Sequence, residues 1–149
     1  MNPPLNNIND QLSLIEALND GIIDVIATDH APHQASEKGE FANSAMAIIG
    51  LQLTFPLLYT KLVISQQLAL STIINALTVN PQQLIKHHNI QLEVNNYTNF
   101  TVIDLSISKV VTPELLQSKS INTPFLGENL TGWPIINVYQ GQIYHLKGE

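Results

Sequence analysis

The 149-residue chain is acidic and contains no cysteine. Twelve Asp and Glu residues outnumber six Lys and Arg residues, which gives a formal net charge of -6. No block of like charge occurs, so we expect neither a nucleic-acid-binding surface nor a membrane-binding patch. The missing cysteines exclude disulfide bonds and thiolate metal sites, so any metal must be bound by His, Asp or Glu side chains. With 44% hydrophobic residues, the chain can bury one core of ordinary domain size.

The first part of the chain is predicted to contain a helix followed by a buried strand. Residues 9–18 place apolar side chains at helical spacing behind a cap at Asn9 or Asp10. Residues 22–27 are apolar and rich in β-branched side chains, which is typical of a parallel strand buried on both faces. Residues 29–43 are then expected to form a loop at the carboxyl end of that strand, where ligands gather in α/β folds.

Helices are predicted next, and β-structure after them. Residues 45–63 indicate a buried helix kinked or broken at Pro56, and two shorter helices are expected at 68–77 and 81–85. After residue 89 the composition favours strands. We therefore divide the chain into a first segment of helices and one strand, 1–88, and a small β-rich segment, 89–149.

Four β-type runs occur in the second segment, and the last two are separated by Gln140-Gly141, which predicts a hairpin turn. The runs are residues 100–105, 109–112, 135–139 and 143–146. The sequence has neither a run of 18 apolar residues nor a signal peptide pattern at its start, so we expect a cytoplasmic protein.

One dense cluster of potential metal ligands follows the predicted strand. It is Thr28-Asp29-His30-Ala31-Pro32-His33, with three ligand-capable side chains in five residues. A carboxylate here can bind a metal and can also accept a proton from metal-bound water. The same residues also allow a structural interpretation, in which Asp29 caps a turn and both histidines are structural or solvated. The residues alone leave both interpretations open.

The chain resembles bacterial class I dihydroorotases over essentially its whole length. The residues that carry the resemblance are Met1-Asn2-Pro3-Pro4-Leu5, residues 27–33 with Glu37-Lys38, Gly50-Leu51, residues 55–60, residues 77–81, residues 101–104, Ser118-Lys119 and residues 122–127. The T-D-H-A-P-H and N-T-P-F-L-G blocks together are highly specific.

This resemblance implies a fold class and a reaction. The fold is α/β: the C-terminal fragment of an amidohydrolase (β/α)8 TIM barrel plus a small β-rich composite domain. The family reversibly converts N-carbamoyl-L-aspartate to L-dihydroorotate in pyrimidine biosynthesis, at a centre of one or two zinc ions. In the hydrolytic direction, a metal-activated hydroxide attacks the cyclic amide carbonyl.

The resemblance also assigns roles to individual residues. Asp29 matches the aspartate of the last barrel strand, which binds metal and shuttles the proton, so it is the predicted catalytic residue and metal ligand. His33 matches a histidine that pairs with the substrate carboxylate. Asn2 matches an asparagine that contacts the substrate ring. His30 is interpreted as a support of the loop rather than a metal ligand.

Two departures from the family pattern affect the expected site. Asn6 stands where relatives usually have Arg, which removes a basic group near the mouth of the site. Residues 44–48, Ser-Ala-Met-Ala-Ile, stand where relatives typically read A-P-F-G-I, and the loop is one residue shorter. Because alanine does not supply the positive φ that glycine can, the substrate contacts of Met46 and Ala47 are in question.

The family's remaining metal ligands lie before the N-P-P-L block and are absent from this sequence. We therefore expect a truncated dihydroorotase that is inactive alone, its partners being the small-molecule substrate and an upstream dihydroorotase half or aspartate transcarbamoylase. The alternative is a non-catalytic dihydroorotase-like scaffold for aspartate transcarbamoylase. A third possibility is another cyclic amidohydrolase, such as an allantoinase or dihydropyrimidinase.

Overall fold

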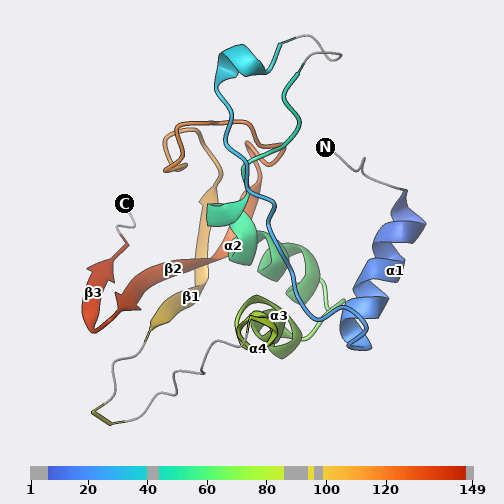
Figure 1. Ribbon diagram of the computed structural model, residues 1–149, viewed down its shortest axis with the longest axis vertical. Coiled ribbons are helices and arrows are strands. Elements are labelled where there is room, and N and C mark those ends of the chain that lie inside the picture. Colours follow the sequence, from blue (N-terminus) through green and yellow to red (C-terminus); the bar gives the residue numbers. More distant parts are fainter. Residues whose placement is uncertain (1–6, 40–43, 86–93, 96–98, 147–149) are drawn as a thin grey trace.

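The computed structural model describes residues 7–39, 44–85, 94–95 and 99–146. The three-stranded sheet lies on one side of the molecule, helix α1 lies on the opposite side, and helices α2, α3 and α4 lie between them (Figure 1). None of the helices in these ranges combines the length and the apolar character needed to span a bilayer. In chain order the elements are α1 Ile8–Asn19, η1 Ala35–Glu37, η3 Leu51–Leu53, α2 Thr54–Leu58, η4 Tyr59–Val63, α3 Leu70–Leu77, α4 Val79–Leu84, β1 Phe100–Val110, β2 Asn129–Tyr139 and β3 Gln142–His145.

Helix α1 confirms the first predicted helix, but its cap is Asn7 rather than Asn9 or Asp10. The Asn7 side chain accepts hydrogen bonds from the backbone N–H groups of Asn9 and Asp10, at 2.9 and 3.2 Å. Such a cap satisfies N–H groups that have no partner within the helix. No residue of α1 is buried. The helix is therefore held by local bonds more than by packing.

The strand predicted at residues 22–27 is wrong for this chain. These residues form no strand in the structure, and the Ile26 N–H donates to the Ala76 carbonyl of α3 at 3.1 Å. A strand is defined by the ladder it shares with a neighbour, and the described residues provide none here. The burial predicted from the apolar sequence is wrong as well, because none of these residues is buried and Ile22 is 75% exposed.

The helix predicted at residues 45–63 begins later than expected. Residues 44–50 are not helical, and the helical path runs through η3, α2 and the π-turn η4. Pro56 lies buried in the first turn of α2, where a missing N–H does no harm, so it does not break the helix. Helices α3 and α4 confirm the two shorter predictions to within two residues.

The sheet is antiparallel with the strand order β1-β2-β3. Residues 100–105 and 109–110 belong to one long strand, β1, and β2 begins at residue 129 rather than 135. The pairing of β1 with β2 shifts between Asp104 and Ser108, where the Asp104 carboxylate accepts hydrogen bonds from both the N–H and the hydroxyl of Ser106. Gln140 and Gly141 both have positive φ, 50° and 78°, which confirms the predicted hairpin turn.

The hydrophobic core joins the sheet to the segment around η3 and α2. Its buried members are Ile49, Leu53, Val111, Leu116, Leu130 and Trp133. Gly132 lies against the stacked rings of Phe55 and Tyr59, and a Cβ there would be 2.7 Å from Tyr59 Cδ1. A side chain at residue 132 would therefore separate the helix from the sheet.

Candidate functional site

Asp29 begins the loop that carries the predicted site residues. Its φ is 47°, in the left-handed region that aspartate tolerates better than most residues. The Thr28 hydroxyl accepts a hydrogen bond from the His30 N–H at 3.3 Å, so the chain turns sharply at this point. The side chain of Asp29 is exposed and has no ion-pair partner among the described residues.

His30 supports the loop, as the sequence suggested. Its ring nitrogen Nδ1 accepts hydrogen bonds from the N–H groups of Gly50 and Leu51, each at 3.2 Å. A nitrogen that accepts from two N–H groups carries no proton, so in the neutral ring the proton lies on Nε2. These two bonds tie the start of η3 to the loop, and Nδ1 is not available to a metal.

His33 lies four residues beyond Asp29 and interacts with Glu37. The distance from His33 Nδ1 to Glu37 Oε2 is 3.3 Å, and Glu37 Oε2 also accepts from the Gln34 N–H at 2.9 Å. The pKa of Glu37 lies below its usual value, chiefly because of that backbone bond and then because of His33. A carboxylate only accepts, so Nδ1 donates. The other ring nitrogen, Nε2, is therefore the one that a ligand would meet.

A second segment, residues 45–49, runs beside the loop and is bonded to it. The Ala45 N–H donates to the Glu37 carbonyl at 2.8 Å, and the Ala31 N–H donates to the Ile48 carbonyl at 3.2 Å. The Lys38 ammonium donates to the carbonyls of Ala45 and Ala47, both at 2.6 Å. Lys38 therefore binds the two segments together.

Ala47 corrects the expectation that alanine avoids positive φ at this position. Its φ is 142°, a region occupied almost only by glycine. The Ala47 carbonyl accepts from Lys38 Nζ and also from Asn122 Nδ2 at 2.7 Å. The neighbouring Ile49 N–H donates to the Asn122 carbonyl at 2.9 Å. These bonds hold Ala47 in a strained conformation that it would not adopt alone.

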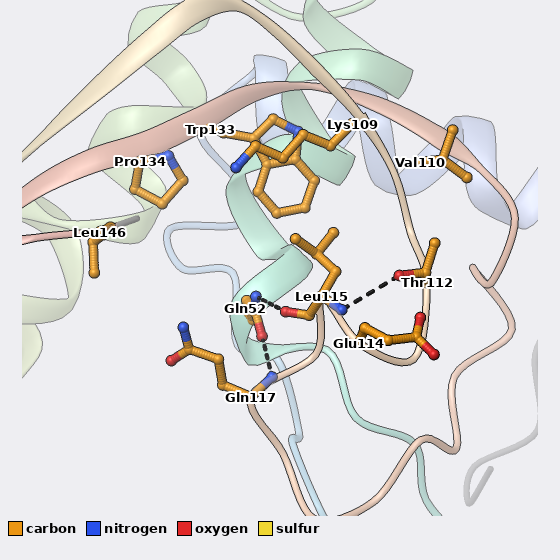
Figure 2. A pocket seen from close by; sticks show the side chains of 10 residues that line it. All are labelled: Gln52, Lys109, Val110, Thr112, Glu114, Leu115, Gln117, Trp133, Pro134 and Leu146. Atoms are coloured by element: carbon orange, nitrogen blue, oxygen red, sulfur yellow. Dashed lines mark hydrogen bonds between the residues drawn. The ribbon is translucent and has the colours of Figure 1, made fainter. Parts of the chain in front are cut away.

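Two cavities flank this part of the chain. The smaller, of about 320 Å³, is lined by His33, Lys38 and the 119–123 stretch. The larger, of about 540 Å³, lies against the sheet around Trp133 and contains neither Asp29 nor a histidine. Figure 2 shows its wall, where the Gln52 amide bonds both the Leu115 carbonyl and the Gln117 N–H. Of these two cavities, the smaller is the one that contains a predicted site residue, His33.

The described residues do not by themselves fit a metal centre. Within the ranges that the structure covers, no three His, Asp or Glu side chains gather closely enough to bind an ion. A catalytic zinc normally takes three protein ligands, and here only the Asp29 carboxylate is accessible in the predicted position. Asn2 and Asn6 lie outside the described residues.

Sequence reasoning missed the roles of Lys38 and Asn122. Both stand inside the blocks that carry the family resemblance, Glu37-Lys38 and residues 122–127, but no local pattern indicates that they meet at one carbonyl. Lys38 and Asn122 reach Ala47 from opposite sides in sequence, 9 and 75 residues away. Only tertiary structure brings them together.

The sequence is similar to that of curated dihydroorotases. It is 44% identical to the dihydroorotase of Carboxydothermus hydrogenoformans over 99% of this chain and 36% of that protein. It is also 44% identical to the Brevibacillus brevis dihydroorotase, over 97% of this chain and 34% of that protein. The chain thus spans about a third of the length of the relatives it matches. No protein-family model matches it.

Solved structures with this fold are amidohydrolases. L-Hydantoinase from Arthrobacter aurescens matches 99% of this chain with 34% of its own, at a TM-score of 0.88 and 25% identity. D-Hydantoinase from Thermus sp. matches 96% of this chain with 32% of its own, at a TM-score of 0.86 and 23% identity, a likeness of fold alone. The inactive dihydroorotase-like domain of the Chaetomium thermophilum CAD-like multifunctional protein matches 93% of this chain with 36% of its own, at a TM-score of 0.68 and 25% identity.

These neighbours confirm the expected fold class, a fragment of a TIM-barrel amidohydrolase with a small β-rich part. Dihydroorotases and hydantoinases act on cyclic amides and are metal-dependent. The identity to curated dihydroorotases, 41–44% over the whole chain, exceeds the 25% identity to the hydantoinase of highest structural similarity described above. The chain therefore belongs to the dihydroorotase family and corresponds to about a third of a family member.

Proposed function

We propose that this chain supplies the Asp29 and His33 side of a dihydroorotase active site and is inactive alone. Asp29 would bind metal and transfer the proton, and His33 would pair with the substrate carboxylate. The reaction would be the reversible conversion of N-carbamoyl-L-aspartate to L-dihydroorotate. We also propose that Asn2 contacts the substrate. The chain would be divided into a barrel segment, residues 1–88, and a small β-rich segment, residues 89–149.

The observation that carries this proposal is the order of the site loop. His30 holds the start of η3, Glu37 holds His33, and Lys38 joins residues 29–38 to residues 45–49. Bonds of this kind keep reactive side chains in fixed positions, which catalysis requires. A loop without a catalytic role would have little need of so many bonds around two polar side chains, the exposed Asp29 and the half-buried His33.

The metal and the remaining ligands belong to the same proposal. We propose zinc, one or two ions, with Asp29 as one ligand and the others outside this chain. An upstream dihydroorotase half or aspartate transcarbamoylase would be the protein partner. We further propose that the protein acts in the cytoplasm.

The test is a chimera in which this chain replaces the matched segment of the Carboxydothermus hydrogenoformans dihydroorotase. Dihydroorotate hydrolysis is followed by ultraviolet absorbance. We expect activity in the chimera and none in the isolated chain with added zinc. Asp29→Ala should lower kcat by about a hundredfold or more, as expected for loss of an acid-base group.

Asp24→Ala provides the matched control, because Asp24 is an exposed aspartate five residues earlier. Its backbone carbonyl accepts a hydrogen bond from Asn80, and its carboxylate forms none with the residues that the structure describes. This variant should leave activity unchanged. His33→Gln should mainly raise KM for dihydroorotate, because it removes a contact made before the reaction as well as during it. Equal activity of the Asp29→Ala and parent chimeras would refute the assignment of Asp29.

A non-catalytic scaffold is the second candidate function. It is favoured by the similarity to the inactive dihydroorotase-like domain and by residues 44–48, which depart from the family pattern. On this alternative, the chimera would be inactive while the chain bound aspartate transcarbamoylase. Hydrolysis of a hydantoin or dihydropyrimidine in preference to dihydroorotate would instead indicate the third possibility, another cyclic amidohydrolase.

A further inference from the structure

The Ala47 carbonyl joins two segments that line the cavity beside His33. Lys38 comes from the loop that carries His33, and Asn122 comes from the 119–123 stretch. Both residues line the cavity, and Ala47 is not among its lining residues. The Lys38 ammonium and the Asn122 side-chain amide donate to the same Ala47 oxygen, at 2.6 and 2.7 Å. We call this carbonyl with its two donors the Ala47 junction.

Further hydrogen bonds reinforce the Ala47 junction on both sides. The Lys38 ammonium also donates to the Ala45 carbonyl at 2.6 Å. The Ile49 N–H donates to the Asn122 carbonyl at 2.9 Å. Lys38 and Asn122 therefore each make two hydrogen bonds to residues 45–49. Residues 45–49 thus hold the two segments that line the cavity in a fixed relative position.

The Ala47 junction is also connected to His33. Glu37 Oε2 lies 3.3 Å from His33 Nδ1, and the Glu37 carbonyl accepts from the Ala45 N–H at 2.8 Å. The pKa of Glu37 is lowered chiefly by the Gln34 N–H, then by His33 and, to a smaller extent, by the charge of Lys38. A change at the junction should therefore reach the carboxylate that holds His33.

The Ala47 junction maintains a backbone conformation that alanine avoids. The φ of Ala47 is 142°, and residues in such strained conformations persist only where the surrounding structure imposes them. Strain of this kind gathers at active sites, where it accompanies a fixed geometry. Loss of either donor should let Ala47 relax, and residues 45–49 should move with it.

We propose that Lys38 and Asn122 are positioning residues, which set the affinity for dihydroorotate by fixing His33 through the Ala47 junction. They would act on substrate binding and leave the proton transfer at Asp29 unchanged. This inference rests on the proposed function, in which His33 pairs with the substrate carboxylate. It predicts an effect on KM rather than on kcat, because His33 contacts the substrate before the reaction as well as during it.

The first experiment measures kinetics in the chimera with the Carboxydothermus hydrogenoformans dihydroorotase. Asn122→Ala should raise KM for dihydroorotate about fivefold and Lys38→Met about tenfold, with kcat changed less than about twofold. Asn80→Ala is the matched control, because Asn80 Nδ2 also donates to a backbone carbonyl, that of Asp24, at 2.8 Å and outside the cavity. The control should leave KM unchanged. A role in stability alone would lower the active fraction, and hence the apparent kcat, without changing KM.

Ala47→Gly provides a rescue that separates positioning from direct contact with the substrate. Glycine adopts a φ of 142° without strain, so Asn122→Ala should raise KM less than about twofold in a chimera that also carries Ala47→Gly. An Asn122 side chain that bound the substrate itself would not be replaced in this way. The same increase in KM with Ala47 and with Gly at this position would overturn the inference.

NMR of the isotope-labelled chain tests the Ala47 junction without any activity. Asn122→Ala should shift the His33 ring resonances and the amides of residues 45–49, and Asn80→Ala should shift neither. If the chimera is inactive but these shifts occur, the proposed function fails, while the positioning of His33 by the junction is supported. Unchanged His33 resonances in the Asn122→Ala protein would overturn the inference, whatever the activity of the chimera.

Discussion

Two regions of the molecule differ sharply in how they are held together. The sheet unit comprises β1–β3 with the packed segment η3–η4, and the amino-terminal arm comprises α1 and residues 20–28. In the sheet unit Leu130 is 0% exposed and Trp133 is 3% exposed, whereas in the arm Leu14 is 56% and Ile22 is 75% exposed. The sheet unit has a core of its own, while the apolar side chains of the arm are exposed or half-buried and none is fully buried.

This contrast shows that apolar sequence and a folded core are different things. Both regions are rich in Leu and Ile, but only the sheet unit closes its core within the described residues. Burial, not composition, provides the stabilising free energy, at about 25 cal/mol for each Å² of apolar surface removed from water. We expect the sheet unit to contribute far more than the arm to the stability of this chain.

The largest effect should come from emptying the core of the sheet unit. Leu130→Ala removes a fully buried side chain and should lower the free energy of unfolding by about 3 kcal/mol. Leu14→Ala in the arm should change it by less than about 0.5 kcal/mol. Urea unfolding followed by the single tryptophan measures both. Equal losses would break the contrast, because α1 would then be packed as tightly as the sheet.

A second pair of variants separates close packing from backbone conformation. Gly132 and Gly21 both have positive φ, 88° and 69°, but only Gly132 has neighbours where a Cβ would stand. Gly132→Ala should therefore cost about 2–3 kcal/mol, and Gly21→Ala in the arm about 1 kcal/mol. The same urea experiment compares them. A larger loss at Gly21 would contradict the steric explanation.

Ala47→Gly should stabilise the protein, by about 1 kcal/mol. Glycine adopts the φ of 142° without strain, and this gain exceeds its greater entropy in the unfolded chain. The change would sharpen the contrast between the sheet unit and the arm. It would show that residues 45–49, which are bonded to Asn122, contribute to stability together with the sheet unit. Thermal unfolding provides the measurement, and a lower Tm for Ala47→Gly would count against the strain.

Lys38→Met tests the same strain from the other side. With Lys38 gone, one of the two donors to the Ala47 carbonyl is lost, so the strained conformation should be harder to maintain. Lys38→Met should therefore lower the free energy of unfolding. It should lower it less in a protein that also carries Ala47→Gly, because glycine adopts this conformation without strain. Additive effects would mean that Lys38 and Ala47 act independently.

The smallest effect should come from titrating Glu37, which is exposed and lies outside the sheet unit. Its pKa is lowered from 4.5 by the Gln34 N–H and by His33. A lowered folded-state pKa means that the stabilising contribution is present above pH 4.5 and is lost as the pH falls through the lowered value. The Gln34 amide shift measured by NMR against pH should report this transition, and a midpoint above 4.5 would contradict the geometry.

The sequence predicted what local chemistry decides. The Gln140-Gly141 turn follows from residues that accept positive φ. Helix α1 follows from apolar spacing, and α4 from a proline that suits the start of a helix. The placement of Asp29 and His33 in one loop followed from the polar residues 29–43, which contain Pro32 and Gly39. The roles of Asp29 and His33 stay predictions.

What the sequence could not predict depends on distant partners. Residues 22–27 were predicted as a strand because their composition is typical of a buried strand. A strand needs a neighbouring strand to pair with, and the residues that the structure describes provide none at this place. The conformation of Ala47 depends on Asn122, 75 residues away. A rule that alanine avoids positive φ is correct on average and fails where other bonds impose the conformation.

The Gln52 and Thr60 side chains have a consequence for the order of folding. Gln52 bonds backbone groups 63 and 65 residues later, and Thr60 bonds both backbone groups of Thr131, 71 residues later. Contacts between such distant residues form slowly, because a long loop must close before they are made. The site loop depends on Asn122 in the same way. We therefore expect α1 to fold early and locally, and the loop carrying Asp29 to become ordered only after β2 has docked.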